Sequence, residues 1–296
     1  MILSIGEILY DVFPDQRRLG GAPFNFAFHL KRLGFPVRFV SRVGGDEAGR
    51  TILHCIEDAG FAAQDIEIDT NHDTGWVRVV LDDRGSPRFH IVPDVAYDHI
   101  TGGAHLAALV KSGPQLIYFG SLIQRTGAGF RNLHDILDRR EKRTRLFYDM
   151  NLRKGCRKAG IIEASLTRAD ILKLSDDELE ASARLLGMPG QGDALVDTLM
   201  HRFDIPVTAL TRGAEGSSLY MNGRKYSAAP GPDIQVVDTV GAGDAHAAML
   251  AAGILDGMPP ETILFEASRF SGRICTIRGA IPGDRRLYDD FRREAI

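Results

Sequence analysis

The sequence contains few cysteines and no long hydrophobic segment. Three cysteines occur in 296 residues, Cys55, Cys156 and Cys275, and no two of them form a Cys-x-x-Cys pair. This odd, scattered set argues against a disulfide framework and a structural zinc site, and it is typical of a reducing compartment. No stretch approaches the roughly 18 apolar residues of a membrane-spanning helix, and residues 1–8 do not resemble a signal peptide. We expect a cytoplasmic protein without membrane contact.

The charge balance lacks the excess of lysine and arginine that nucleic acids and anionic membranes select. The chain has 36 Lys+Arg against 39 Asp+Glu, which gives a formal net charge of −3. Its one basic cluster, residues 139–143, is interrupted by Glu141, and we interpret it as the solvated end of a helix. We therefore expect no nucleic-acid partner.

Short apolar runs alternate with segments of helical periodicity, which is the pattern of a mainly parallel sheet covered by helices. The predicted strands span residues 2–5, 37–41, 116–119, 146–149, 171–174 and 207–210. The best marked helices span residues 24–33, 47–59, 128–139, 177–186, 244–255 and 261–276. With 44% apolar residues the chain can bury a large core, and no linker separates two independent units. We predict one α/β domain over residues 1–296.

One region interrupts this alternation. Residues 76–82 and 88–92 are strand-like runs, and residues 82–87 between them are rich in turn formers. Polarity alternates along both runs, so one face can cover a site while the other meets water. We interpret this hairpin as part of a small sheet that projects from the main domain as a lid or a dimer contact.

The segment most informative about chemistry is Val-Asp-Thr-Val-Gly-Ala-Gly-Asp-Ala-His, residues 237–246, where a strand-like end meets a glycine turn and a strong helix. Small residues let backbone amides approach a ligand, and a helix N-terminus adds oriented N–H groups and partial positive charge. The segment therefore predicts an anion site. Asp244, in the first turn of the helix, is either a helix cap or a general base beside bound phosphate.

Two common phosphate-binding motifs are absent. Gly-x-x-x-x-Gly-Lys-Ser/Thr occurs nowhere, and residues 241–243 lack the third glycine of the dinucleotide fingerprint. A dinucleotide-binding turn normally follows the first strand and is followed by an acidic residue about 20 positions later, whereas this turn lies late in the chain. An oxidoreductase is therefore the weaker alternative.

A second glycine-containing segment lies near the N-terminus. Gly20 and Gly21 permit close approach of the backbone to a ligand, Pro23 marks the first position of a helix, and Asn25 offers a donor and acceptors for hydroxyls. Asp11 lies just past the first strand, where ligand sites of open α/β sheets gather. Taken alone, the segment is equally consistent with a plain junction of loop and helix.

Together the two segments resemble the signatures of the ribokinase-like family of sugar kinases. Residues 148–153 are similar to the family's Asp-x-Asn-x-Arg stretch and residues 210–217 to its nucleotide-binding turn, so the resemblance covers nearly the whole chain. It implies a three-layer α/β fold with a central, mostly parallel sheet. It also implies a small β lid, formed by residues 9–19 and 76–92, and a homodimer assembled through that lid.

Within this family the sequence is most similar to the fructokinases, through residues 20–25, 92–98 and 278–282. The implied reaction is ATP-dependent phosphorylation of a monosaccharide hydroxyl, with D-fructose as the first candidate. Kinases of 2-keto-3-deoxygluconate share much of the same pattern, so a sugar-acid kinase is the alternative, and a basic residue in the sugar pocket would favour it. An alternative of another class is a non-catalytic sugar or nucleotide sensor, against which the retained Asp244 argues.

The resemblance also implies residue roles. Asp244 would accept the proton of the attacking hydroxyl, and the amides of Gly241, Ala242 and Gly243 would stabilise charge on the transferring phosphate. The residues expected to hold the sugar hydroxyls are Asp11, Gly20, Gly21 and Asn25. Arg153 would reach the sugar or the phosphates, or else form a structural salt bridge.

The residues expected on the nucleotide side are Thr211, Gly213, Gly216 and Ser175. Ser175 replaces the family's usual asparagine, which weakens the expectation of a nucleotide contact there. Glu178 would organise Mg²⁺ and phosphate through water, because a metal must offset the phosphate charge.

Asp238 and the backbone of Val240 match positions that surround a monovalent cation in some relatives, which makes K⁺ a candidate activator, although Asp238 is as well suited to organising the turn. His246 is interpreted as a structural histidine.

Overall fold

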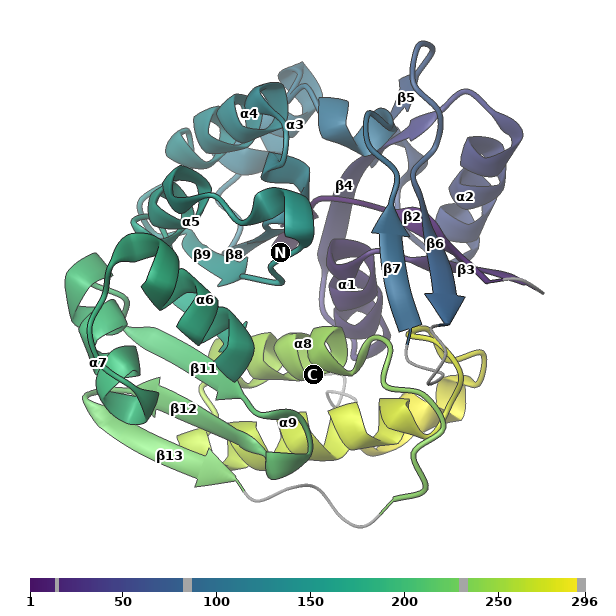
Figure 1. The fold of residues 1–296 in the computed structure, drawn as a ribbon. Helices are drawn as coiled ribbons and strands as arrows, with labels where there is room; N and C mark the ends of the chain where they lie inside the picture. The colour runs from purple at the N-terminus through teal and green to yellow at the C-terminus, as the bar shows by residue number, and fades with distance from the viewer. Residues whose placement is uncertain (14–15, 82–86, 229–233, 292–296) are drawn as a thin grey trace.

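The structure is a computed structural model that describes residues 1–13, 16–81, 87–228 and 234–291 (Figure 1). The strands of its large sheet are β1 (Ile2–Ile5), β4 (Val37–Gly44), β5 (Ile66–Asp69), β8 (Leu116–Gly120), β9 (Arg145–Asp149), β10 (Ile171–Ser175), β11 (Val207–Thr211), β12 (Ser217–Met221) and β13 (Arg224–Ala228). They lie in the order β13-β12-β11-β10-β9-β8-β1-β4-β5. Neighbours run parallel from β5 to β11, and β12 and β13 continue the sheet as an antiparallel hairpin.

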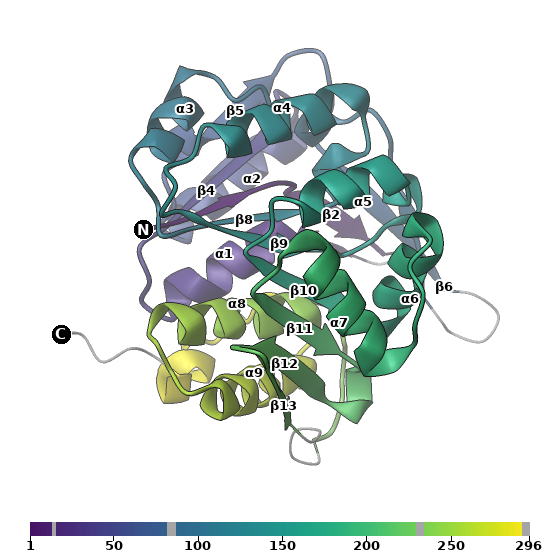
Figure 2. The same cartoon turned by 90° about the vertical axis from the view of Figure 1, so that its left-hand side faces the viewer.

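Helices cover both faces of this sheet and make three layers (Figures 1 and 2). One face carries α1 (Ala22–Arg32), α2 (Glu47–Asp58), α8 (Ala242–Leu255) and α9 (Pro260–Cys275). The other carries α3 (Ala104–Lys111), α4 (Gly127–Asp138), α5 (Ala159–Leu166), α6 (Asp176–Leu186) and α7 (Gly192–Phe203). Successive residues of a strand point to opposite faces, so Ile2 joins the first core and Leu3 the second. This confirms the predicted three-layer α/β fold.

A smaller sheet forms the lid. Its strands are β2 (Leu9–Val12), β3 (Arg17–Gly20), β6 (Trp76–Leu81) and β7 (Pro87–Ile91), in the order β3-β2-β6-β7. β2 pairs antiparallel with β3 and parallel with β6, so the lid joins the N-terminal segment to the predicted hairpin. Residues 14–15 of the expected lid and residues 82–86 of its turn lie outside the described residues.

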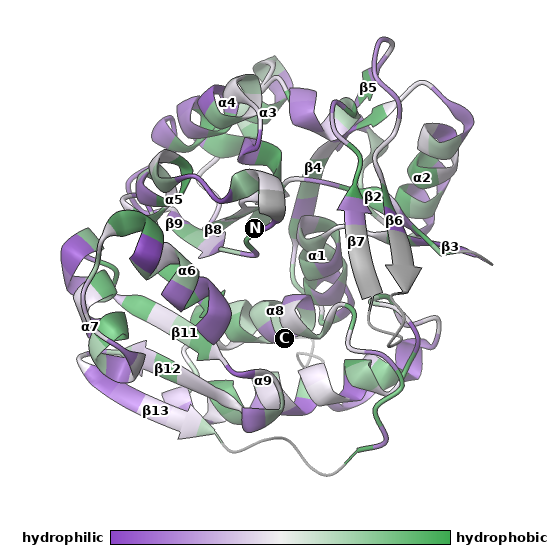
Figure 3. Cartoon of the chain, viewed as in Figure 1, coloured by the Kyte–Doolittle hydropathy of each residue, from purple (hydrophilic) through white to green (hydrophobic). Residues whose placement is uncertain are grey.

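The strands and helices named from the sequence are all present, with shifted ends. One detail of the prediction is wrong: α1 begins at Ala22, so Pro23 is the second residue of the helix. The sequence patterns do not indicate β5, β12, β13, α3, α5 or α7; β13, for example, is mostly exposed at a sheet edge and has no apolar run. In Figure 3, α4, α5 and α6 each carry hydrophilic and hydrophobic residues, as expected of helices that cover a sheet with one face. None of the described helices is long and apolar enough to cross a membrane.

The order of the strands predicts where a ligand binds. The chain passes from β1 to β4 on one side and reaches β8 on the other, so the direction of winding reverses at β1. In open α/β sheets, ligands bind beyond the carboxyl ends of the strands at such a point. Glu7 follows the carboxyl end of β1 directly, and it is buried.

Candidate active site

The glycine turn before α8 places Asp244 at a helix N-terminus. Gly241 is the N-cap residue with a φ of 80°, and a Cβ atom there would lie 2.2 Å from the Cβ of Ala280. Only glycine fits this position, because the backbone is left-handed and the neighbouring loop leaves no room. Ala242, Gly243 and Asp244 then form the first turn of the helix, where free N–H groups favour an anion.

Asn25 binds Asp244 directly across the site. The Nδ2 of Asn25 donates to the Oδ2 of Asp244 at 2.7 Å, and both side chains are buried. α1 brings Asn25 there because Gly21, its N-cap residue, packs closely: a Cβ atom on Gly21 would lie 2.5 Å from the carbonyl oxygen of Glu7. The predicted sugar residue and the predicted base are therefore brought together.

Three carboxyl groups in this region have raised pKa values. Burial, and then the charge of Asp149, raise the pKa of Asp244 to about 7, while the hydrogen bond from Asn25 opposes the rise. Burial also raises the pKa of Glu7 to about 7, and its Oε2 atom has no hydrogen-bond partner among the described residues. Burial raises the pKa of Asp11 to about 6. Such a group of buried carboxyls is typical of a functional site.

A buried ion pair lies behind the glycine turn. Lys173 of β10 donates through Nζ to the Oδ1 of Asp149 at 2.9 Å, and the hydroxyl of Tyr118 donates to the Oδ2 of Asp149 at 2.9 Å. A Cβ atom on Gly243 would lie only 3.6 Å from the Nζ of Lys173. Burial would lower the pKa of Lys173, but the carboxylates of Asp149 and Glu178 outweigh it and the pKa is raised. The ammonium group thus stays charged beside the predicted anion site.

The side chain of Asp11 reaches Gly20 within the lid. Asp11 of β2 is paired with Arg18 of β3, and a Cβ atom on Gly20, two residues further along β3, would be 2.6 Å from the Oδ2 of Asp11. The positive charge of Arg153 lowers the pKa values of Asp11, Glu7 and Asp244, which places Arg153 near all three carboxyls. Its side chain is exposed and makes no hydrogen bond or ion pair with the described residues. A salt bridge to another described residue therefore does not account for Arg153.

The predicted nucleotide residues lie at the ends of two adjacent strands. Ser175 and Thr211 are cross-strand neighbours at the carboxyl ends of β10 and β11. Gly213 and Gly216 follow in the next turn with φ values of 53° and 94°, which favour glycine. Within the described residues, no hydrogen bond joins this group to Asp244.

Glu178 links the start of α6 to the segment that follows β9. Its Oε2 accepts from the backbone N–H of Ser175 at 2.8 Å, and the Oγ of Ser175 accepts from the N–H of Glu178 at 3.2 Å, which is a capping box at the start of α6. Its Oε1 accepts from the N–H of Leu152 at 2.6 Å, so the segment that carries Arg153 is fixed to α6. Each carboxylate oxygen keeps a free acceptor site, which is compatible with a contact to metal-bound water.

Two further residues have local partners. The Oδ1 of Asp238 accepts from the N–H of Val240 at 3.1 Å and its Oδ2 from the N–H of Gly279 at 2.8 Å, so Asp238 organises the turn. The Nε2 of His246 lies 3.2 Å from the Oγ of Ser217, and burial lowers the pKa of His246 to about 3. A neutral, buried His246 agrees with its structural interpretation.

Comparison with known proteins identifies the family. The model of the pfkB family of carbohydrate kinases matches residues 2–285. The chain belongs to this family. Its reaction class is therefore phosphoryl transfer to an alcohol group of a carbohydrate, and the resemblance to ribokinase-like sugar kinases is confirmed. The weaker alternative, an oxidoreductase, does not apply to this carbohydrate kinase.

Proteins similar to this carbohydrate kinase are named as sugar kinases and fructokinases. It is 29% identical over 309 residues to probable fructokinase-5 of Arabidopsis thaliana, covering 95% of this chain and 93% of the relative. It is 28% identical over 272 residues to a putative sugar kinase of Pyrococcus horikoshii, covering 86% and 83%. The crystal structure of that sugar kinase in complex with ATP has a TM-score of 0.81 and covers 95% of this chain and 94% of its own, at 26% identity. A fructokinase of Vibrio cholerae O395 with bound fructose, ADP and calcium shares the fold with a TM-score of 0.80, at 22% identity and 97% coverage of both chains.

The pH dependence of the carbohydrate kinase should report the buried carboxyls. If Asp244 is the base, it must be ionised, so kcat/KM should rise with pH with a midpoint near 7. Removing the hydrogen bond of Asn25 in Asn25→Ala should move the midpoint upward, because that bond lowers the pKa of Asp244. Initial rates across the pH range measure both values.

The matched control for this experiment is Asn132→Ala, which removes a partly buried side-chain amide that donates to the carbonyl oxygen of Ile100. Its midpoint should equal that of the parent. A parent midpoint near the ordinary aspartate pKa, or equal midpoints for Asn25→Ala and the parent, would contradict the assignment of Asp244.

Proposed function

We propose that the protein transfers the γ-phosphoryl group of ATP to a hydroxyl of D-fructose. The observation that carries this proposal is the buried contact between Asn25 and Asp244 at the N-terminus of α8, which joins the predicted sugar residue to the predicted base. Fructose is supported by the names of the relatives and by the sequence of residues 20–25, 92–98 and 278–282.

In this proposal Asp244 accepts the proton of the attacking hydroxyl. The backbone N–H groups of Gly241, Ala242 and Gly243 stabilise the charge that builds on the transferring phosphate, and the helix N-terminus adds its partial positive charge. Burial of Asp244 makes its carboxylate more basic, since its pKa lies near 7. Catalysis then rests on positioning and electrostatics, as is usual for phosphoryl transfer.

The sugar lies between the lid and the large sheet. The residues proposed to hold its hydroxyls are Asp11, Gly20, Gly21 and Asn25. Asp11 comes from the lid and Asn25 from α1, so both layers contribute to the site. The close packing of Gly21 on the carbonyl of Glu7 supports a second role in fixing the start of α1.

ATP binds beyond β10 and β11 in this proposal, at Ser175, Thr211 and the turn of Gly213 and Gly216. Mg²⁺ accompanies the nucleotide and offsets the charge of its phosphates. In this proposal Glu178 acts on the metal through water, while each of its oxygens also accepts a backbone N–H. K⁺ is included as a candidate activator beside Asp238 and Val240.

Arg153 favours a second candidate substrate. It is a cation near Asp11 and Asp244 that forms no ion pair with the described residues. An arginine fork matches a carboxylate well, so a sugar acid such as 2-keto-3-deoxygluconate would find a partner there. A phosphate oxygen of ATP would use Arg153 equally well, which keeps neutral fructose as the first candidate.

A substrate panel tests the proposed function. ADP formation from Mg·ATP is measured with fructose, glucose, ribose, tagatose, 2-keto-3-deoxygluconate and nucleosides, with and without K⁺, and with the Asp244→Asn protein as the blank. Selective turnover of fructose is the expected result. Preference for 2-keto-3-deoxygluconate would replace fructose and keep the reaction class. No turnover of any member would contradict the proposed substrates, and calorimetry with ATP would then tell an untested sugar from a binding-only protein.

We also propose a cytoplasmic homodimer assembled through the lid. β3 and β7 are the edge strands of the lid sheet, and such edges are commonly covered by another chain. The three cysteines are unpaired, which suits a reducing compartment. The molar mass of the purified protein from light scattering measures the oligomeric state.

A further inference from the structure

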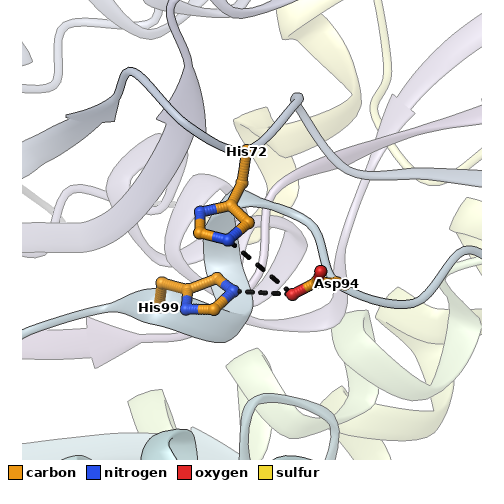
Figure 4. A group of neighbouring side chains, drawn as sticks. All are labelled: His72, Asp94 and His99. Atoms are coloured by element: carbon orange, nitrogen blue, oxygen red, sulfur yellow. Dashed lines mark hydrogen bonds and ion pairs between the residues drawn. The ribbon is translucent and has the colours of Figure 1, made fainter.

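One group of metal-ligating side chains lies outside the active site within the described part of the chain. His72, Asp94 and His99 gather at the base of the lid, with their nearest ligand atoms within 4.8 Å of one another (Figure 4). His72 lies four residues before β6, Asp94 three residues after β7, and His99 in the 3₁₀ turn Ala96–His99 of the main domain. Both ends of the β6–β7 hairpin therefore meet the main domain at this point.

Each histidine nitrogen lies about as far from the carboxylate of Asp94 as two ligands of a tetrahedral ion lie from one another. In Figure 4 the Nε2 atoms of both histidines point to the same carboxylate oxygen, Oδ1 of Asp94. The distance is 3.0 Å from His99 and 3.7 Å from His72. Ligands about 2.0–2.1 Å from a tetrahedral Zn²⁺ lie about 3.3 Å from one another, which falls between these two values.

A buried carboxylate fixes the orientation of His72. The Nδ1 of His72 lies 3.0 Å from the Oδ2 of Asp69, whose side chain is fully buried. Asp69 also accepts from the N–H of Asn71 at 2.8 Å and from the Nε of Arg42 at 2.7 Å, so its carboxylate is an acceptor towards the ring of His72. The proton of a neutral His72 is then on Nδ1, and the lone pair of its Nε2 faces the carboxylate of Asp94. A cation between this lone pair and the carboxylate would be bound by both of them.

We propose that His72, Asp94 and His99 bind one divalent transition-metal ion of the Zn²⁺ class. Two imidazoles and one carboxylate suit Zn²⁺, whereas Mg²⁺ and Ca²⁺ prefer oxygen ligands alone. The carboxylate that orients His72 is the usual outer partner of a metal-binding histidine. The side chain of Asp94 is 76% exposed, so water has access to the fourth coordination position.

Ion binding requires one ring to turn. The two imidazoles are stacked with centroids 3.7 Å apart and planes at 15°, so their lone pairs run nearly parallel. His99 is the ring that turns, because its side chain is 28% exposed and Asp69 holds His72. The bound ion pins both ends of the lid hairpin to the main domain, in addition to the backbone bond from Ala96 N–H to the carbonyl of Asp73.

Metal binding to the full-length protein tests this proposal independently of kinase activity. Metal-free protein without nucleotide is titrated with ZnCl₂ by calorimetry, and with CoCl₂ by visible absorption, which detects tetrahedral Co²⁺. We expect one ion per chain, and at least a tenfold weaker affinity in His72→Gln, His99→Gln and Asp94→Asn. His54→Gln, at an 82% exposed histidine of α2, is the matched control and should bind as the parent does.

Asp69→Asn tests the orienting carboxylate and should weaken Zn²⁺ binding by about 10–100-fold. Melting temperatures of all variants show that each one folds. Absence of Zn²⁺ binding to the folded parent would overturn the proposal. The side chains of His72, Asp94 and His99 would then be joined by hydrogen bonds only. Undiminished binding in the His72 and His99 variants would overturn it as well, because the ion would then lie elsewhere.

Discussion

Asp244→Asn should lower kcat by about 10³–10⁴-fold, at the upper end of what a positioned general base contributes. Asparagine has nearly the shape of aspartate but cannot accept the proton of the attacking hydroxyl. The amide of Asn25 can turn so that its oxygen accepts from the new side chain, which keeps the contact between α1 and α8. Single-turnover phosphorylation at pH 8, where Asp244 of the parent is ionised, measures the loss.

The same variant should fold at least as stably as the parent. Burial raises the pKa of Asp244 from 3.8 to about 7, so this carboxyl favours the folded state below about pH 4, and the contribution is lost as the pH rises through 7. At pH 8 the ionised group opposes folding, and asparagine removes that cost. Asp135→Asn, at an exposed position of α4, is the matched control for both activity and melting temperature. Near-parental turnover by Asp244→Asn would exclude it as the base.

The sequence predicts the layers of the fold because burial imposes a simple pattern. β1, β8 and β9 are buried on both faces and read as apolar runs, and α2 and α4 present one apolar stripe. The glycine turn before α8 could also be recognised from the sequence, because small residues between a strand end and a helix indicate a site where the backbone approaches a ligand. The strand β12 was missed because it is an inner strand with only three apolar residues in Ser217–Met221, and the edge strand β13 was missed because it follows a different rule. β13 is solvated and pairs on one side only, so its residues are polar.

The electrostatics of the site could not be predicted from the sequence. Glu7 lies two residues after the end of β1, and this position beyond the carboxyl end of the strand is a signal that could have identified it. Lys173 was a second signal, as the one charge in the apolar run of β10. Its partner Asp149 lies 24 residues away, and only the pairing of β9 with β10 shows that the charges meet behind Gly243. Burial and the charge of Asp149 raise the pKa of Asp244, while the charge of Lys173 opposes the rise.

Lys173→Met should lower the free energy of unfolding by about 3–5 kcal/mol, because it leaves the carboxylate of Asp149 buried without its cation. Both side chains are buried, 8% and 0% exposed, so water cannot replace the lost ammonium group. The hydroxyl of Tyr118 remains as a single donor to Asp149. Urea unfolding at pH 8 measures the change, and Lys111→Met, at an exposed lysine of α3, should leave the stability unchanged.

The double variant Lys173→Met/Asp149→Asn separates two effects on stability. One is the loss of the ion pair, and the other is the cost of the stranded charge, the carboxylate of Asp149 left buried without a cation. Replacing both partners of a buried ion pair by neutral residues is often close to neutral for stability, so the double variant should recover most of the loss. Its turnover should remain below that of the parent, because Lys173 supplies positive charge beside Gly243 that neither new side chain provides. A double variant as unstable as Lys173→Met would contradict the stranded-charge explanation. Full turnover by a stable double variant would show that the pair serves the fold alone.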